Sequence, residues 1–285
     1  MKIEILKAGL NTTIQDLGRF QGLAYGVPFS GAMDKQSFRF GNSILDNLLT
    51  EAAIEFCLIG PAVKFYSPGE IALTGVNLKP TINDIPVQLN TKLSVFENDV
   101  LKFKGNNSLG VYGYICFNGK LDVPLFWGSK STYLYGELGG LDGRKLEKGD
   151  VLEIKTTTKF ISHKSKINLK KEPTILISPG PEYLEFSKLD RDEIVNKIGV
   201  ISMDSNRMGA RVENMKLQGT KSGNIISSGT IPGTIQVPAS GKPIVLLADS
   251  PCTGGYPRIA VVNSKDLDQF CQIKPGASFC FKWES

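Results

Sequence analysis

Two segments in the last third of this chain are so rich in glycine and proline that they restrict the possible fold more than any other feature. They cover residues 229–243 and 249–257, and the apolar run 244–248 between them predicts a buried strand. Turns joined by one short strand are typical of β structure. Two interpretations stay open: tight turns of a barrel, or loops that bind a ligand.

Short apolar or alternating runs separated by turn residues recur along the sequence and predict a mainly β protein, of the barrel or sandwich type. Helical signals are fewer: Lys35–Leu45 with Asp34 as N-cap, Pro181–Leu184, and Lys265–Phe270 with Ser264 as cap. The predicted strands are Ile3–Leu6, Ala62–Phe65, Glu70–Leu73, Val100–Phe103, Leu109–Phe117, Val151–Ile154, Thr174–Ile177, Ile244–Ala248, Arg258–Val262 and Ser278–Lys282.

Three segments in which a tight turn leads into a strand resemble one another: 96–103, 146–154 and 273–281. Turns that lead into strands are common, so this echo gives modest support to two related halves. Residues 156–172 are rich in lysine, serine and threonine and predict a linker. The chain therefore divides into an N-terminal β half, 1–155, and a C-terminal β-barrel half, 173–285.

The composition excludes several classes of protein. A length of 285 residues with 41% hydrophobic residues allows sizeable cores. A net charge of +5 from largely scattered lysines does not predict a nucleic-acid-binding surface. No run approaches the ~18 apolar residues of a membrane span, and five cysteines without a C-x-x-C pair fit reduced thiols, so we expect a cytoplasmic protein.

The single histidine, His163, lies in the predicted linker. A Ser-His-Asp triad therefore has no base, and no cluster of cysteine and histidine predicts a zinc site, so no metal is expected. The chain also has no P-loop motif. We expect it to bind no cofactor itself, and any ATP that the reaction uses to be bound by a partner.

Residues 9–19 and 26–34 contain the polar side chains of an N-terminal candidate site. Gln15, Asp16 and Arg19 are expected to project from a glycine-containing turn. Either Asp16 and Arg19 form a buried pair that holds this turn, or Arg19 binds a ligand carboxylate. Asp34 could be a general base, although the helix cap is favoured.

A second candidate site is predicted in the glycine-rich C-terminal segments. Gln236 has an amide that can both donate and accept, which suits recognition of an amide or lactam edge. Residues 253–257 offer consecutive backbone N–H groups that could form an anion nest, and a tight turn explains them equally well. Cys252 is expected to pack rather than to act as a nucleophile.

Together these segments resemble the family of the 5-oxoprolinase C subunit, which is also called KipA or allophanate hydrolase subunit 2. The same family is described as a biotin-dependent carboxyltransferase domain. The resemblance covers nearly the whole chain and includes Leu73–Asn77 and Gly139–Leu146. It implies a mainly β fold with a few short helices and a cyclophilin-like β-barrel architecture in two related halves.

The resemblance also implies a function: one component of a bacterial, ATP-dependent 5-oxoprolinase complex that hydrolyses 5-oxoproline to glutamate. Two partner subunits are expected: a KipI-like B subunit and an A subunit. This chain alone is expected to be inactive. On this hypothesis Gln236 and Asp34 are catalytic. The residues expected to bind the substrate are Arg19, Gln15, Ser30, Thr253, Gly254, Gly255 and Tyr256.

Two other functions stay open. One is carboxyl transfer from a partner's biotin to urea or a related amide, and the other is a non-enzymatic antagonist that binds a KipI-like kinase inhibitor. The sequence departs from the resembled family at residues 251–253, where Gln-Thr-Thr is usual, and near Ser228, where a glutamate is usual. Both departures lie in the C-terminal candidate site, so the resemblance leaves the substrate open.

Overall fold

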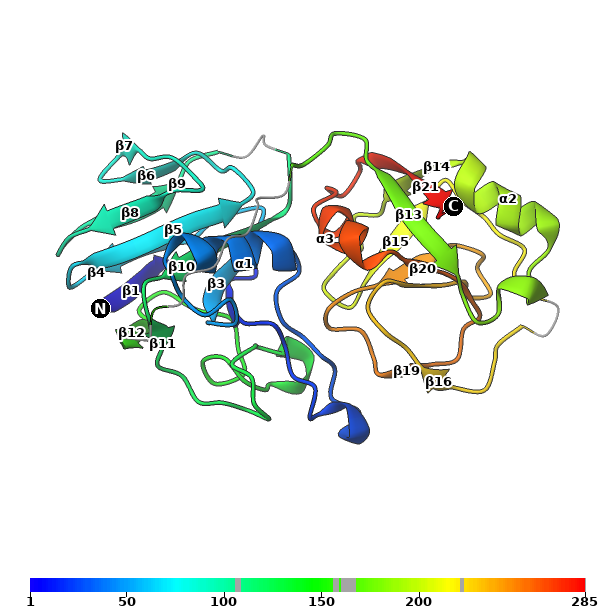
Figure 1. Cartoon of the computed structure of the whole chain (residues 1–285), viewed down its shortest axis with the longest axis horizontal. Coiled ribbons are helices and arrows are strands. Elements are labelled where there is room, and N and C mark those ends of the chain that lie inside the picture. Colours follow the sequence, from blue (N-terminus) through cyan, green and yellow to red (C-terminus); the bar gives the residue numbers. More distant parts are fainter. Residues whose placement is uncertain (106–108, 156–158, 160–167, 221–222, 285) are drawn as a thin grey trace. The chain divides into compact units, whose positions relative to one another are not determined.

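The computed structural model describes residues 1–105, 109–155, 159, 168–220 and 223–284. The chain forms two compact units (Figure 1). The first unit contains Met1–Gln21 and Ser30–Asn168, and the second contains Gly22–Phe29 and Leu169–Ser285. Most of the segment predicted as a linker, with His163, lies outside the described residues. The sequence did not indicate that the short segment 22–29 groups with the second unit.

The first unit consists of two antiparallel sheets. The seven-stranded sheet has the order β11 (Lys120–Leu121), β12 (Val151–Lys155), β1 (Lys2–Lys7), β4 (Ala62–Phe65), β9 (Val100–Phe103), β6 (Pro80–Ile82) and β7 (Ile85–Pro86). The five-stranded sheet has the order β2 (Thr13–Gln15), β3 (Ala53–Cys57), β10 (Tyr112–Phe117), β5 (Gly69–Gly75) and β8 (Lys92–Val95).

Alternating burial brings the two sheets together around one core. In β12 every second side chain is buried, as expected for a strand with one face to solvent. Apolar residues of both sheets, among them Ile3 and Phe65 of one and Ile54 and Phe117 of the other, belong to the same buried cluster. The two sheets therefore pack face to face.

The helix α1 (Lys35–Ile44) packs on β5 and β10 of the five-stranded sheet (Figure 1). All six residues of β10 are consequently buried, because one face of this strand lies in the core and the other contacts α1. The approach is close: a Cβ atom on Gly41 would lie 2.5 Å from the Cys116 Sγ atom. Asp34 caps α1 as predicted, since its Oδ1 atom accepts a hydrogen bond from the Ser37 N–H at 2.8 Å.

The second unit contains a closed barrel, which confirms the barrel expected for the C-terminal half. Its strands follow the order β13 (Thr174–Pro179), β20 (Arg258–Val262), β17 (Thr234–Gln236), β18 (Ile244–Leu246), β15 (Gly209–Glu213), β14 (Ile198–Ile201) and β21 (Ser278–Trp283). The closing pair, β13 and β21, is parallel. A separate two-stranded sheet pairs β16 (Ser228–Gly229) with β19 (Thr253–Gly254), and Figure 1 shows it at one end of this unit.

Two predicted helices of the second unit need correction, and a third was missed. The segment predicted at Pro181–Leu184 forms only a 3₁₀ turn, Tyr183–Glu185. The helix α3 (Ser264–Cys271) is capped by Asn263 and not by Ser264, because the Asn263 side chain accepts from the Lys265 N–H. The helix α2 (Lys188–Asn196) was not predicted from the sequence, although its cap, Ser187, is a typical N-cap residue.

The three segments predicted to be turns followed by strands have this structure. Each turn closes with a hydrogen bond to a carbonyl three residues earlier, donated by Asp99, Asp150 and Ala277, before β9, β12 and β21 respectively. Among the described residues, no helix is both long enough and apolar enough to cross a membrane.

Candidate functional site

The first unit holds a buried polar cluster between the turn after β2 and the loop 129–132. The Asp16 carboxylate accepts hydrogen bonds from the hydroxyls of Ser129 at 2.6 Å and Ser131 at 2.5 Å, and from the N–H groups of Gly18 and Lys130. These donors occupy both carboxylate oxygens. Asp16 therefore fixes the loop to the turn, in place of the direct pair with Arg19 that was one of the two predictions.

Arg19 lies in the same cluster and is 1% exposed. Its guanidinium donates to the Ser30 hydroxyl at 3.2 Å and to the Ser131 carbonyl, and lies 5.9 Å from the centre of the Phe126 ring. A planar donor group held in this way positions neighbouring backbone. These contacts favour a positioning role for Arg19, and the predicted contact with a substrate carboxylate would require the buried guanidinium to become accessible.

Gln15 is fully buried beside this loop. Its amide nitrogen donates to the Thr132 carbonyl and to the Thr13 hydroxyl, both at 3.0 Å. Its Oε1 atom has no hydrogen-bond partner in the described part of the chain. A buried acceptor without a donor is costly, so a purely structural role of Gln15 does not explain this oxygen.

Ser30 and Gly31 form a turn whose backbone is closely constrained. Ser30 is fully buried and has a φ of 54°, which is unusual for a residue with a side chain. A Cβ atom on Gly31 would lie 2.7 Å from the Gly18 nitrogen, so only glycine fits there. The turn thereby brings the Ser30 hydroxyl to Arg19 and leads directly into α1.

Asp34, at the start of α1, belongs to a network that the sequence did not indicate. The Tyr114 hydroxyl accepts from the Asp34 N–H and donates to Glu55 Oε2, both at 2.8 Å, and the same oxygen accepts from the Met33 N–H at 2.9 Å. Burial, and then the neighbouring carboxylates of Glu55 and Asp34, raise the Tyr114 pKa well above its ordinary value. The phenol therefore stays neutral and can keep both hydrogen bonds.

The second unit brings Gln236 next to Gly254. Gln236 ends β17 and is 5% exposed, and its amide nitrogen donates to the Tyr256 carbonyl at 3.5 Å. A Cβ atom on Gly254 would lie 2.4 Å from that nitrogen. The absence of a side chain at residue 254 is thus what allows the amide to lie against β19.

The loop after β19 does not have the backbone of an anion nest. A nest needs a residue in the left-handed region, and neither Gly254 nor Gly255 is among the described residues with a positive φ. Gly254 pairs with Ser228 across the small sheet, and the Gly255 carbonyl accepts from the Ile225 N–H. The tight-turn interpretation does not describe this backbone either, because Thr253 and Gly254 form the strand β19 and no hydrogen-bonded turn is described at residues 255–257. The side chains of Thr253 and Tyr256 are exposed.

An ion pair connects the small sheet to the barrel. The Arg258 guanidinium binds the Glu182 carboxylate through two hydrogen bonds, of 2.8 and 2.6 Å, and donates a third to the Gly229 carbonyl at 2.8 Å. The hydrogen bonds from Arg258 lower the Glu182 pKa below its ordinary value. Arg258 thus connects the barrel strand β20 to β16.

A second pair, Arg207 with Asp249, is almost completely buried. The guanidinium binds both carboxylate oxygens, at 2.8 and 3.0 Å, and the Asp249 N–H donates to the Arg207 carbonyl. The pair holds residue 249, where the second glycine-rich segment begins.

In the first strand of the small sheet, the buried Ser228 hydroxyl has no hydrogen-bond partner within the described ranges.

Sequence reasoning missed Tyr114, Glu55, Glu182 and Arg258. One signal was present: Glu55 interrupts the apolar run of β3, and a carboxylate in such a run needs a buried partner. Of the expected site residues, the first unit brings together Gln15, Arg19 and Ser30, and the second brings together Gln236, Gly254 and Tyr256. Among the described residues, no group of three histidine, cysteine or acidic side chains could hold a metal ion.

Comparison with known proteins identifies relatives along almost the whole chain. Residues 25–283 match the family described as carboxyltransferase domain, subdomain A and B. The chain is 35% identical over 280 residues to the C subunit of 5-oxoprolinase from Escherichia coli, covering 98% of this chain and 90% of that protein. It is 34% identical over 283 residues to the C subunit of 5-oxoprolinase from Haemophilus influenzae, with the same coverage.

A larger enzyme contains a domain of the same structure. The crystal structure of the Kluyveromyces lactis urea amidolyase superposes on the whole of this chain with a TM-score of 0.91 and 28% identity. This chain corresponds to only 19% of that enzyme. The likeness therefore concerns only a part of the amidolyase.

Proposed function

This chain belongs to the carboxyltransferase-domain family with subdomains A and B, and on that premise we propose that it is the C subunit of an ATP-dependent 5-oxoprolinase. The observation that carries the proposal is the identity of 35% to the C subunit of the Escherichia coli 5-oxoprolinase, of which this chain covers 90%. The match covers most of both proteins, whereas this chain corresponds to only 19% of the urea amidolyase.

The reaction we propose is hydrolysis of 5-oxoproline, a five-membered lactam, to glutamate. Amide resonance stabilises such a ring against opening, so coupling to ATP hydrolysis would supply the driving force. Gln236 is suited to recognise the lactam, because its side-chain amide can donate to a carbonyl and accept from an N–H group. Its position against Gly254 supports this role, since the side chain is held at the end of a barrel strand.

Partners complete the proposed enzyme. The KipI-like B subunit, together with the A subunit, would form a cytoplasmic complex with this chain, and a partner would bind the ATP. Asp34 and Arg19 would then have structural roles in this complex. Asp34 caps the N-terminus of α1, and Arg19 holds the backbone at Ser30 through a hydrogen bond to the Ser30 hydroxyl. On this proposal the isolated chain turns over no 5-oxoproline.

Reconstitution tests the proposal. The purified chain is mixed with candidate A and B subunits, ATP and 5-oxoproline, glutamate release is measured, and each protein is omitted in turn. Glutamate formed only in the complete mixture would support the proposal. Glutamate formed equally well without this chain, or by this chain alone, would contradict it.

The family description and the urea amidolyase structure favour a second candidate, carboxyl transfer from a partner's biotin to urea or a related amide. It predicts carboxylated product from urea, bicarbonate, ATP and a biotinylated partner, with no glutamate from 5-oxoproline. A third candidate, binding of a KipI-like kinase inhibitor without catalysis, predicts a stable complex with that inhibitor and neither product.

A further inference from the structure

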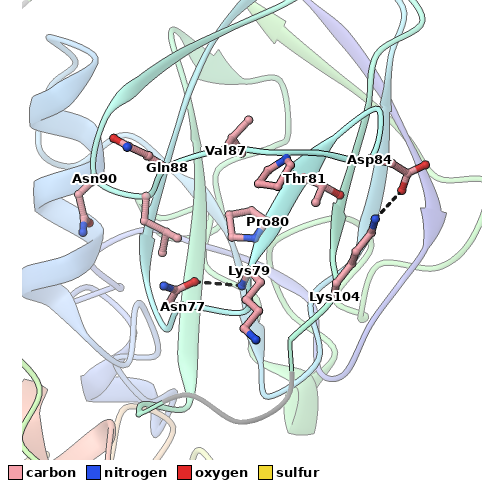
Figure 2. Close-up of a pocket in the computed structure, with 11 residues that line it drawn as sticks. Asn77, Lys79, Pro80, Thr81, Asp84, Val87, Gln88, Asn90 and Lys104 are labelled. Carbon is pink, nitrogen blue, oxygen red and sulfur yellow. Dashed lines mark hydrogen bonds and ion pairs between the residues drawn. The ribbon is translucent and has the colours of Figure 1, made fainter.

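A pocket of about 640 Å³ opens beside the hairpin of β6 and β7 in the first unit (Figure 2). None of its lining residues belongs to the two candidate clusters described above, and its volume is within the range of small-molecule sites. Its apolar wall consists of Pro80, Pro86, Val87 and Leu89, and its polar residues include Asn77 and Lys79.

Lys79 has a backbone conformation that its sequence disfavours. Its φ is 51°, in the left-handed region, and it precedes Pro80, which biases a residue toward extended conformations. The Asn77 side-chain oxygen accepts from the Lys79 N–H at 3.0 Å and holds this turn. Strained backbone of this kind persists where the surrounding structure fixes it, and it is often found at binding sites.

Positive charge exceeds negative charge at this edge of the sheet. Asp84 pairs with the ammonium groups of Lys104 at 2.9 Å and Lys102 at 3.5 Å. Figure 2 shows the Lys104 ammonium turned toward Asp84, while the Lys79 side chain extends away from that pair. Two lysines, Lys102 and Lys104, therefore share the Asp84 carboxylate, and Lys79 has no ion-pair partner among the residues that the structure describes.

The pocket wall also contains an unsatisfied hydroxyl. Thr81 is 4% exposed, and its Oγ1 atom has no hydrogen-bond partner within the described residues. Hydroxyl groups buried in this way are rare in a wall that only completes a core. A bound group would reach this buried hydroxyl only after rotation of the Thr81 side chain about χ1.

We infer that this pocket binds a small organic carboxylate with an apolar body. The donors at the pocket are the Lys79 ammonium, the Asn77 amide nitrogen and, after rotation of its side chain, the Thr81 hydroxyl, while the Asp84 carboxylate is already paired with Lys104 and Lys102. Cationic and N–H donors match carboxylate oxygens, and the two prolines, Val87 and Leu89 match a hydrocarbon or aromatic body. The inference does not rest on the proposed function, because no catalytic step is required of the pocket.

Fluorine NMR of the full chain tests the inference with a matched pair of probes. The probe 4-(trifluoromethyl)benzoate carries the carboxylate, and 4-(trifluoromethyl)benzamide has the same shape without the charge. We expect the benzoate to bind at least fivefold more tightly than the benzamide. Equal affinities, or no binding of the benzoate up to 10 mM (about 2.7 kcal/mol of binding free energy), would overturn the inference.

Variants locate the binding. Lys79→Asn removes the charge and keeps a residue that tolerates a positive φ, so it should weaken benzoate binding at least fivefold, and Lys79→Arg should retain it. Lys148→Gln, in the exposed turn before β12, is the matched control and should have no effect. Thr81→Val should raise the melting temperature of the free chain and weaken binding two- to fivefold. Unchanged binding to the Lys79→Asn variant would place the probe elsewhere and overturn the inference.

Discussion

The side-chain amide of Gln236 occupies the space that a side chain at residue 254 would need, since a Cβ atom on Gly254 would lie 2.4 Å from the amide nitrogen. An alanine there fits the backbone, because Gly254 does not have a positive φ. The neighbouring atom is the far end of a flexible side chain, so the chain should fold while the amide moves. Gly254→Ala therefore tests the position of Gln236 without removing it.

We expect Gly254→Ala to lower glutamate release by the reconstituted complex about tenfold, which corresponds to about 1.4 kcal/mol. The melting temperature should change little. Gly229→Ala, in the paired strand β16, is the control, because, its chain neighbours aside, no described atom lies within 4 Å of the place of its Cβ atom. Equal rates for the Gly254 and Gly229 variants would remove the Gln236 amide from the proposed reaction.

The sequence predicts the long strands well and the short ones poorly. The strand β12 alternates buried and exposed residues over five positions, which is long enough for its period to be recognised. The strands β16 and β19 have two residues each, and no periodicity exists at that length. They become strands only because the two glycine-rich segments meet, which is a tertiary contact.

The candidate sites show the same limit. Asp34 could be predicted as a cap because its partner, the Ser37 N–H, is three residues away. The serines that bind Asp16 are more than a hundred residues away, and Tyr114 is separated from Glu55 by 59 residues. Local sequence patterns carry no information about partners at such separations, so the network around Tyr114 became visible only in the fold.

The hydrogen bonds of Tyr114 should stabilise the first unit. Tyr114→Phe would leave the buried Asp34 N–H and one oxygen of Glu55 without this hydroxyl, so we expect the free energy of unfolding to fall by about 1–3 kcal/mol. Urea denaturation measures the change, and hydrogen exchange in α1 and β10 assigns it to the first unit.

Tyr66 provides the matched control for this prediction. It also donates its hydroxyl to a glutamate, Glu4, but the pair lies at the surface and Tyr66 is 39% exposed. Tyr66→Phe should change the free energy of unfolding by less than about 0.5 kcal/mol, because water replaces the lost partner. A Tyr114 variant as stable as the Tyr66 variant would show that the buried network contributes little.

The pair of Glu182 with Arg258 should make the second unit sensitive to acid. Hydrogen bonds from Arg258 hold the Glu182 pKa below its ordinary value of 4.5. The stabilisation is therefore complete above pH 4.5 and is lost as the pH falls through the lowered pKa. Glu182→Gln should destabilise the unit at pH 7 by about 1–3 kcal/mol and reduce the loss of stability below pH 4.5.

Glu193→Gln is the control for the acid dependence. Glu193 pairs with Lys197 at 2.9 Å, but that lysine side chain is 52% exposed, and surface pairs contribute about 0–1 kcal/mol. Thermal unfolding between pH 3 and 7 compares the two variants. If both variants lose stability below pH 4.5 as steeply as the wild type, another carboxyl group controls the acid transition.

Replacement of Arg19 distinguishes a positioning residue from one that contacts the substrate. Arg19→Ala would remove the donors to the Ser30 hydroxyl and the Ser131 carbonyl, and we expect it to lower the free energy of unfolding by about 1–3 kcal/mol. Arg19→Lys keeps the charge but not the fork of donors, so it should also destabilise. Ser30→Ala removes one partner and leaves the charge in place.

Kinetics of the reconstituted complex with these three variants separate the two roles of Arg19. If Arg19 acts by positioning, glutamate release should fall in all three variants together with stability, through kcat and without a selective rise in KM. A stable Arg19→Ala variant with a strongly raised KM for 5-oxoproline would instead mean that the guanidinium binds the substrate carboxylate. Ser30→Ala decides between them most directly, because it disturbs the turn while the guanidinium stays in place.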